Sequence, residues 1–264
     1  MTNSLIFDID KAAVAQSFSK AAAHYDQFAQ LQRDIGDKLF ASLNKKQTAN
    51  CLDLGCGTGY FSEKLLTQHN IDSLICFDLS AGMLAFLQNN RNLPVNCVQG
   101  DMDCLPFSDN QFSCIFSNLA MQWSSDLQNV LRQLKGVLLA GGELNFSTLL
   151  AGSLIELRDA WQEVDVHPHT NTFLTLVNIE KMLEKVGFTS VNIHQETITL
   201  YYPNVCAVMR DLKGIGANQV HGHQRHKLQG RSLINKLEQG YAKHKTRSGL
   251  LPLSYQVCYI KAVK

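Results

Sequence analysis

The sequence predicts an α/β fold built on a mostly parallel sheet of seven strands. From residue 50 onward, short apolar runs alternate with amphipathic helical stretches, which is the pattern of parallel strands joined by right-handed crossover helices. A glycine-rich turn directly follows the first of these strands, as in folds that bind a ligand at the carboxyl ends of their strands. The last two strand-like segments are separated by a helical stretch and can pair antiparallel at one edge of the sheet.

The chain begins with helical sequence. Within residues 11–44, apolar residues recur three and four positions apart and β-branched residues are few, which predicts two helices. Both precede the first strand, so neither is a crossover within the sheet. We expect residues 1–45 to form a helical lid.

Residues 46–200 are expected to form the α/β core. Its strands are predicted at 50–54, 73–78, 95–99, 112–117 and 142–149, and its helices at 59–68, 80–90, 126–139, 153–164 and 178–186. Gly141 and Gly142 are expected to cap the end of the third of these helices. A period-two strand over 188–202, a basic helical insertion over 201–250 and a last core strand over 251–264 complete the chain.

Composition bounds the class of protein. A chain of 264 residues with 45% hydrophobic and 18% charged residues can bury a sizeable core. Its first residues lack a basic segment followed by an apolar stretch, and no run approaches the ~18 apolar residues of a membrane span, so we expect a cytoplasmic protein without membrane attachment. The eight cysteines include no C-x-x-C pair, which favours reduced thiols over disulfides or a structural metal.

The charge is unevenly distributed. The net charge is +1, but residues 205–264 hold eleven Lys or Arg against two acidic residues, a local balance of +9 that leaves −8 on the first 204 residues. Such asymmetry indicates an acidic partner, although a solvated basic face is the plainer interpretation. Within the histidine-rich stretch 221–231, His221, His223 and His226 have no carboxylate nearby, so a basic docking surface with Arg225, Lys227 and Arg231 is favoured over a metal site.

The turn "CLDLGCGTGY", residues 51–60, holds the clearest ligand signal. Gly55, Gly57 and Gly59 permit positive φ angles and let a ligand lie against bare backbone at the start of a helix. Their G-x-G-x-G spacing differs from the G-x-G-x-x-G of pyrophosphate-binding turns, and no P-loop Lys follows. Asp53, two residues before the first glycine, would repel a phosphate but suit the cationic tail of a ligand.

Two later acidic positions extend this site. Asp78 ends the second strand, where a carboxylate can accept hydrogen bonds from both hydroxyls of a ribose. Asp101 and Met102 follow the third strand, where they suit the amino group and the face of an adenine. Each carboxylate alone is more simply a cap or a solvated group, but the three in register predict S-adenosylmethionine as cofactor, S-adenosylhomocysteine as product, and no metal.

Three stretches of the sequence resemble a known family of enzymes. The stretches "DLGCGTG", "FDLSAGML" and "GDMDCLPF" resemble the class I S-adenosylmethionine-dependent methyltransferases over about residues 48–150. The resemblance implies a Rossmann-like sheet with an antiparallel edge strand. It also implies cofactor contacts from Leu79, Met83 and Asn118 in addition to the residues above.

A tighter resemblance covers the whole chain. The motifs "FSKAAAHYDQFAQLQ", "NLAMQW", "GSLIELRDAW", "MRDLKGIGAN" and "LPLSY" resemble the malonyl-acyl-carrier-protein O-methyltransferases of biotin biosynthesis. These motifs are not the ones shared by cofactor cores in general, so they are the specific ones. The resemblance implies esterification of the free malonyl carboxylate on a carrier-bound thioester. The ester masks the charge, so that fatty-acid enzymes can elongate the chain.

This chemistry needs positioning more than proton transfer. A carboxylate is already ionised at neutral pH, so no general base is required, and no catalytic His, Cys or Lys stands out from spacing. The candidate cations for the malonyl group or a phosphopantetheine phosphate are Arg210 and Lys213, with Arg158 on a less specific helix. Lys213 is about as well explained as a cation at a helix C-terminus.

Aromatic residues are candidates for the walls of the site. Tyr25 is expected over the cofactor as part of the lid, with core packing as the alternative. Gln122 and Trp123 are candidates for an acyl tunnel, and Trp123 is equally explained by burial in the core.

Three other functions remain open from the sequence. A nucleic-acid methyltransferase would also use a basic face, but the sequence "NLAM" replaces the [ND]-P-P-[YF] stretch that holds a flipped base. A methyltransferase for another small acid or for the ubiquinone pathway would share the cofactor core. A non-catalytic protein that binds the cofactor is also compatible. The sequence leaves open the preferred thioester, the oligomeric state and the cation that contacts the substrate.

Overall fold

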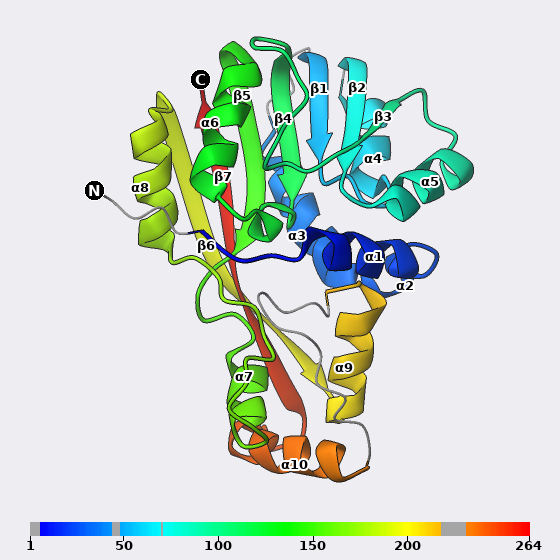
Figure 1. Cartoon of the computed structure of the whole chain (residues 1–264), viewed down its shortest axis with the longest axis vertical. Helices are drawn as coiled ribbons and strands as arrows, with labels where there is room; N and C mark the ends of the chain where they lie inside the picture. Colours follow the sequence, from blue (N-terminus) through cyan, green and yellow to red (C-terminus); the bar gives the residue numbers. More distant parts are fainter. Residues whose placement is uncertain (1–5, 44–47, 70, 218–230) are drawn as a thin grey trace.

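The computed structural model describes residues 6–43, 48–69, 71–217 and 231–264 of the chain. A seven-stranded sheet with the order β3-β2-β1-β4-β5-β7-β6 runs through the molecule (Figure 1). The strands are β1 (Thr48–Leu54), β2 (Ile71–Asp78), β3 (Asn96–Gln99), β4 (Phe112–Asn118), β5 (Leu138–Leu149), β6 (Ser190–Tyr202) and β7 (Leu251–Val263). β1 to β5 pair in parallel, and β7 lies antiparallel between β5 and β6. The predicted sheet, including the antiparallel pairing of the last two strands at one edge, is confirmed.

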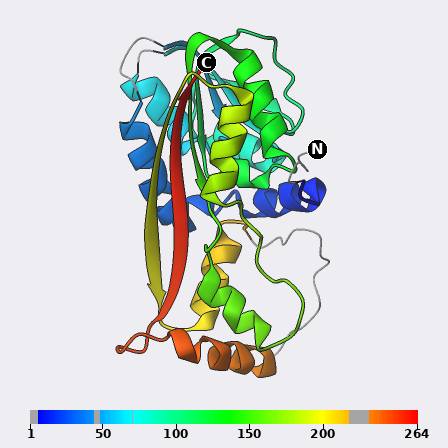
Figure 2. The same cartoon turned by 90° about the vertical axis from the view of Figure 1, so that its left-hand side faces the viewer.

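Crossover helices cover both faces of the sheet (Figure 2). α4 (Tyr60–Gln68) and α5 (Ala81–Asn90) pack on one face, whereas α6 (Leu127–Val137) and α8 (Leu176–Val186) pack on the other. Alternation along β1 sends Cys51 toward the first face and Leu52 and Leu54 toward the second, as the period of a strand requires. Because the parallel strands share a direction, β1, β2 and β4 all end at one edge of the sheet, where the ligand site was expected.

The N-terminal segment forms three helices, not the two that its periodicity predicted. They are α1 (Lys11–Ala21), the single turn α2 (Tyr25–Phe28) and α3 (Gln30–Ala41). Ala29, with φ −87° and ψ +30°, interrupts the helix between α2 and α3. The breaks let each piece pack on a different element, since α1 lies on α5, α2 on α9 and α3 on β4 and β5. Figure 1 shows α1 and α2 crossing below the carboxyl ends of the strands.

The predicted glycine cap after α6 is wrong. α6 ends at Val137, and β5 begins at the next residue, so Gly141 and Gly142 lie inside the strand. The pairing of β5 with β4 is irregular there, because Phe112 pairs with Leu138 while Cys114 pairs with Glu143. Gly141 adopts a φ of +74° at this irregularity, which is the conformation that favours glycine in a bulge.

A second lobe extends beyond the core. β7 pairs with β5 only over Val257–Val263, so the first residues of β7 pair with β6 alone. Three helices of the described part of the chain surround this end of the antiparallel β6–β7 pair, as Figures 1 and 2 show: α7 (Ile155–Gln162), α9 (Val205–Gly214) and α10 (Arg231–Tyr241). We call this part of the molecule the distal lobe. The predicted boundary at residue 200 therefore divides the lobe, because α7 comes from earlier in the chain and packs against α10.

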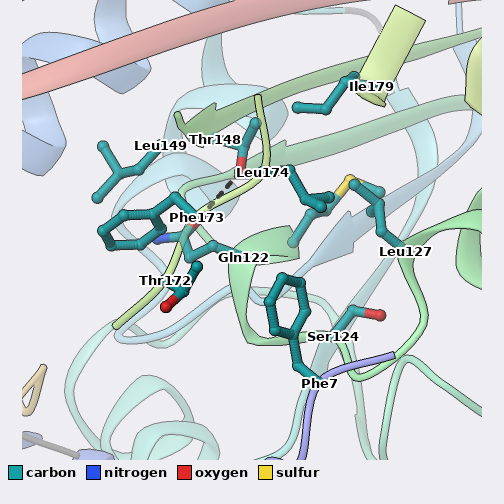
Figure 3. Close-up of a pocket in the computed structure, with 11 residues that line it drawn as sticks. Phe7, Gln122, Ser124, Leu127, Thr148, Leu149, Thr172, Phe173, Leu174 and Ile179 are labelled. Atoms are coloured by element: carbon teal, nitrogen blue, oxygen red, sulfur yellow. Dashed lines mark hydrogen bonds between the residues drawn. The ribbon is translucent and has the colours of Figure 1, made fainter. Parts of the chain in front are cut away.

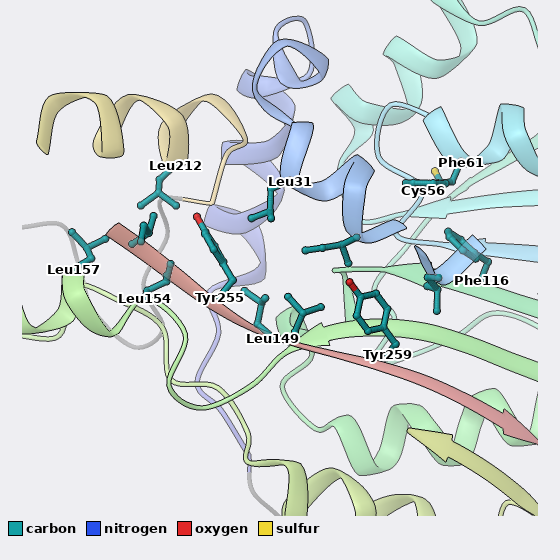
Figure 4. Packing of buried hydrophobic residues seen from close by; sticks show 14 of the residues in the cluster. Leu31, Cys56, Phe61, Phe116, Leu149, Leu154, Leu157, Leu212, Tyr255 and Tyr259 are labelled. Atoms are coloured by element: carbon teal, nitrogen blue, oxygen red, sulfur yellow. The ribbon is translucent and has the colours of Figure 1, made fainter. Parts of the chain in front are cut away.

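The core and the distal lobe share one apolar cluster. It runs from Phe61 and Phe116 beside the core sheet, through Leu31 of α3, to Tyr255 and Leu212 of the distal lobe (Figure 4). A continuous cluster of this kind fixes the lobe against the carboxyl edge of the sheet. All eight cysteines are free thiols in the structure. Among the described residues, no helix is long and apolar enough to cross a membrane.

Candidate active site

The glycine turn after β1 has the conformation that its spacing predicted. Gly55, Gly57 and Gly59 adopt φ angles of +73°, +54° and +78°. A Cβ atom on Gly55 would lie 2.3 Å from the Cβ of Ala120, and one on Gly59 would lie 2.6 Å from the side chain of Leu87, so both positions exclude larger residues. A Cβ on Gly57 would meet nothing within 4 Å. Gly57 therefore presents bare backbone to open space, which fits a ligand lying against the turn.

Asp78 lies directly beside this turn. Its Oδ2 accepts the N–H of Gly57 at 2.9 Å, and its Oδ1 accepts the N–H of Ser80 at 2.8 Å. A carboxylate has about four acceptor sites, so each oxygen keeps one for a hydroxyl of a ribose. Burial raises the pKa of Asp78, and the two backbone hydrogen bonds oppose that rise. The half-buried side chain thus fits the predicted contact with both ribose hydroxyls.

Asp53 lies beneath the turn, not in it. Its side chain is buried, with 2% of the residue exposed, and its Oδ2 accepts a hydrogen bond from Ser62 at 2.6 Å. Burial raises the pKa of Asp53 to about 7, the bond from Ser62 opposes this, and the charge of Asp78 adds to it. A carboxyl that ionises near neutral pH can respond to a cationic ligand above it, which is compatible with the role that the sequence suggested.

The residues expected at the adenine end separate into two groups. Asp101 and Met102 follow β3 and are partly exposed, whereas Met83 is buried within α5 and Leu79 is partly buried between β2 and that helix. Lys11 of α1 reaches over this loop, with its Nζ 2.8 Å from Asp101 and 2.8 Å from Asp103. Sequence reasoning missed Lys11, because only the fold brings α1 to the loop after β3.

Asn118 ends β4 at the same edge. Its Nδ2 donates to the carbonyl oxygen of Gln32 in α3, and its Oδ1 accepts from Ser147 of β5. The next residue, Leu119, has a φ of +50°, a strained value for a branched side chain. Strain of this kind persists where surrounding contacts fix it and is concentrated at functional sites.

Tyr25 begins α2 and lies close to the glycine turn. The side chain is half-buried, and burial, followed by the negative charges of Asp78 and Asp26, raises its pKa. The next residue, Asp26, accepts a hydrogen bond from Thr58 of the turn at 2.6 Å, which places this end of α2 beside the turn. This position agrees with a place over the cofactor.

The motif "MRDLKGIGAN" packs against the N-terminal helices. A Cβ on Gly214 would lie 2.3 Å from the ring of Phe28, and one on Gly216 would lie 3.2 Å from Phe18. Both glycines therefore allow the end of α9 to approach the N-terminal helices closely. Arg210 and Lys213 on α9 are exposed, and neither forms an ion pair with a described residue.

Arg158 lies on a different helix from Arg210 and Lys213. It is exposed on α7 and lines a hollow formed with the 163–173 loop. In that hollow, the ring of His169 stacks on Trp161 at 3.7 Å and its Nε2 lies 2.8 Å from Asp165. α7 and α9 both pack on α10, so Arg158 lies in the same lobe as Arg210 and Lys213. It lies on a different helix from these two residues.

Gln122 and Trp123 follow β4 in a short 3₁₀ turn, η1 (Met121–Trp123). Gln122 lines a narrow apolar cavity together with Phe7, Leu149 and Phe173, and Thr148 donates a hydrogen bond to its Oε1 (Figure 3). Trp123 packs edge-on against Phe18 of α1, with ring centroids 5.5 Å apart. Trp123 therefore contacts the N-terminal helices and is not part of this cavity.

The predicted docking residues of the histidine-rich stretch are outside the described residues. This applies to His221, His223, His226, Arg225 and Lys227, and nothing of the Arg231 side chain is described. Elsewhere, the described part of the chain holds no group of His, Cys, Asp and Glu side chains suited to a metal ion.

Comparisons with known proteins cover both lobes. The family described as "Methyltransferase domain" matches residues 52–146. The malonyl-[acyl-carrier protein] O-methyltransferase of Serratia marcescens is 39% identical over 251 residues, which are 95% of this chain and 95% of that protein. The protein of the same name from Yersinia pestis is 40% identical over 258 residues, which are 96% of this chain and 91% of that protein.

A solved structure supports the fold. The phosphoethanolamine N-methyltransferase 2 of Haemonchus contortus, in complex with S-adenosyl-L-methionine, matches with a TM-score of 0.59 at 16% identity, over 93% of this chain and 57% of that chain. Fold, domain match and relatives agree on the class of enzyme. The chain is an S-adenosylmethionine-dependent methyltransferase and belongs to the malonyl-[acyl-carrier protein] O-methyltransferase family.

Proposed function

We propose that this enzyme methylates the free carboxylate of a malonyl group carried as a thioester on acyl carrier protein, and that the ester enters biotin synthesis. The observation that carries the proposal is the identity of 39–40% to enzymes of that name over both lobes, the distal lobe included. Family-specific motifs also meet in the structure, since Glu156 accepts hydrogen bonds from the backbone N–H and the hydroxyl of Ser254. Tyr202 likewise donates to Asp211 of the α9 motif.

S-adenosylmethionine, when bound, supplies a methyl group on a positively charged sulfur. The glycine turn and Asp78 would hold its nucleoside, with Asp53 beneath the turn and Asp101 and Met102 at the adenine end. Asn118 and Tyr25 would border the reacting atoms. These residues need only bind and orient, because a malonyl carboxylate is ionised at neutral pH and requires no base. Positioning of this kind can contribute roughly 7 to 11 kcal/mol to catalysis.

Cations of the distal lobe would guide the substrate. Arg210 and Lys213 are the candidates for the malonyl carboxylate or the phosphopantetheine phosphate, because α9 packs on the helix that begins with Tyr25. Lys213 also lies in the last turn of α9, where a cation stabilises the helix. The exposed cations Lys236 and Arg247 form no ion pair with any described residue and suit docking of an acidic carrier protein.

Methyl transfer to three acceptors tests the proposal. Malonyl-acyl carrier protein, malonyl-coenzyme A and free malonate are compared with methyl-labelled S-adenosylmethionine, and the product is identified as a base-labile methyl ester. We expect the highest kcat/KM for a malonyl thioester, with the carrier-bound form preferred. Methylation of none of the three, by protein that binds S-adenosylhomocysteine, would refute the assignment.

Charge reversal tests docking separately. The double variant Lys236→Glu/Arg247→Glu should lower kcat/KM for malonyl-acyl carrier protein at least tenfold at low salt, because steering acts on association. The same variant should keep its kcat/KM for malonyl-coenzyme A within about twofold. Lys181→Glu on α8 is a control for charge reversal elsewhere, since this exposed lysine lies on the core, away from the distal lobe (Figure 1). An equal loss in the control, or no loss in the double variant, would contradict the docking surface.

A further inference from the structure

A single carboxylate joins the N-terminal helices to the glycine turn. Asp26 lies in α2, next to Tyr25. Its Oδ1 accepts a hydrogen bond from the hydroxyl of Thr58 at 2.6 Å, and its Oδ2 lies 2.7 Å from Nη2 of Arg91. Thr58 is the residue between Gly57 and Gly59, and only 2% of it is exposed. The bond from α2 therefore ends inside the turn that faces the ligand.

The guanidinium group of Arg91 contacts two further groups besides Asp26. Its Nε donates to the carbonyl oxygen of Thr58 at 2.5 Å, and its Nη1 lies 2.7 Å from Glu63 of α4. Only 14% of the Arg91 side chain is exposed. A guanidinium with three fixed partners loses little side-chain entropy in forming its bond to Asp26, so this ion pair is stronger than an ordinary surface pair.

The first two N-terminal helices, α1 and α2, are attached to different parts of the core. α1 is held by Lys11 on the loop after β3 and by the Ser19 hydroxyl, 2.8 Å from that of Ser80. α2 has the Asp26 contacts on one side and the packing of Phe28 on Gly214 on the other. Tyr25, one residue before Asp26, is therefore held beside the glycine turn by this attachment.

We infer that Asp26 is a positioning residue: its carboxylate latches α2 onto Thr58 and Arg91 and so holds Tyr25 over the cofactor site. The inference rests on the cofactor site proposed above. With the latch formed, α2 covers the glycine turn, and the nucleoside leaves only when the Asp26 contacts break. Asp26 thus controls the dissociation of the cofactor and its product, without touching either.

The test is the dissociation rate of S-adenosylhomocysteine, measured by chase of labelled ligand from the whole protein. Asp26→Asn keeps the size of the side chain but removes the charge that faces Arg91. We expect dissociation about tenfold faster in this variant, which corresponds to about 1.4 kcal/mol. In the wild type, added salt should speed dissociation, whereas in the variant this dependence should be lost.

Glu63→Gln is the matched control. It removes an ion pair of the same length from the same guanidinium, but Glu63 lies on α4 and forms no hydrogen bond or ion pair with the described residues of the N-terminal helices. The dissociation rate of S-adenosylhomocysteine from this variant should stay within twofold of the wild type, because the carbonyl oxygen of Thr58 still holds the guanidinium beside Asp26. Equal rates in Asp26→Asn and Glu63→Gln would overturn the latch. Because binding does not depend on the acceptor, this outcome is independent of the assignment of malonyl thioester as substrate.

Hydrogen exchange distinguishes the latch from a general loss of stability. In Asp26→Asn, the amides of residues 25–33 should exchange faster, whereas those of α1 should keep wild-type rates because Lys11 and Ser19 still hold that helix. Faster exchange across both segments, or in neither, would contradict the proposal. Asp26→Glu restores the charge and should recover the salt dependence of dissociation.

Discussion

Replacing the buried carboxyl of Asp53 should change the stability of the protein and its affinity for the cofactor product in opposite directions. Asp53→Asn replaces an ionisable group by a neutral one of the same shape, which can still accept the hydrogen bond from Ser62. The native pKa is about 7 against an ordinary value of 3.8. Because a shift of one pKa unit corresponds to about 1.4 kcal/mol, ionisation of Asp53 above pH 7 destabilises the native state by up to roughly 4 kcal/mol.

The sign of the pH dependence follows from this shift. Between about pH 4 and pH 7 the native state keeps a proton that the unfolded state loses, so this group makes the protein less stable as the pH rises through that range. At pH 5, about one unit above the ordinary pKa, Asp53→Asn should already be the more stable by about 1–2 kcal/mol. At pH 8 the difference should grow to about 4 kcal/mol.

Denaturation by urea at pH 5 and pH 8 measures this difference, and calorimetry with S-adenosylhomocysteine measures binding on the same samples. We expect the variant to bind at least tenfold more weakly at pH 8, because it lacks the negative charge that would attract the ammonium group on the amino-acid tail of the ligand. A variant that is less stable than the wild type by the same amount at both pH values would refute the reasoning.

Three further substitutions test the glycine turn and the distal lobe. Gly57→Ala and Gly141→Ala both place an alanine at positive φ, with no atom within 4 Å of the new Cβ. Each should therefore destabilise the protein by about 1 kcal/mol in thermal unfolding. Only Gly57→Ala should also weaken the binding of S-adenosylhomocysteine in calorimetry. Equal affinities would contradict a ligand at Gly57. Glu156→Ala leaves the N–H and hydroxyl of Ser254 without their acceptor and should lower stability by about 2–3 kcal/mol in urea, whereas an unchanged midpoint would show that these bonds add nothing.

The sheet and the conformation of the glycine turn were predictable from the sequence, because both depend on local signals. Strand and helix periods repeat within a few residues, and the spacing of the glycines before Asp78 is a short-range pattern. The irregularity at Gly141 was missed, because a glycine after a helix signals a cap and a bulge equally well until the partner strand is known.

The links between the N-terminal helices and the core were not predictable in the same way. Lys11 meets Asp101 across ninety positions of sequence, and Asp26 meets Arg91 across sixty-five. Nothing in the local sequence distinguishes these side chains from solvated charges on a helix. The distal lobe was split at residue 200 for the same reason, since the packing of α7 on α10 depends on how far the β6–β7 hairpin extends.

The central claim is that Asp78 accepts hydrogen bonds from the ribose hydroxyls. A thermodynamic cycle, in which the ligand and the protein are each changed, tests it most directly. Calorimetry compares S-adenosylhomocysteine with its 2′,3′-dideoxy analogue on the wild type and on Asp78→Asn. If Asp78 accepts both hydroxyls, the wild type should lose at least a hundredfold in affinity for the analogue, and the variant should bind the two ligands within about threefold of each other. An equal loss for the analogue in both proteins would contradict the account.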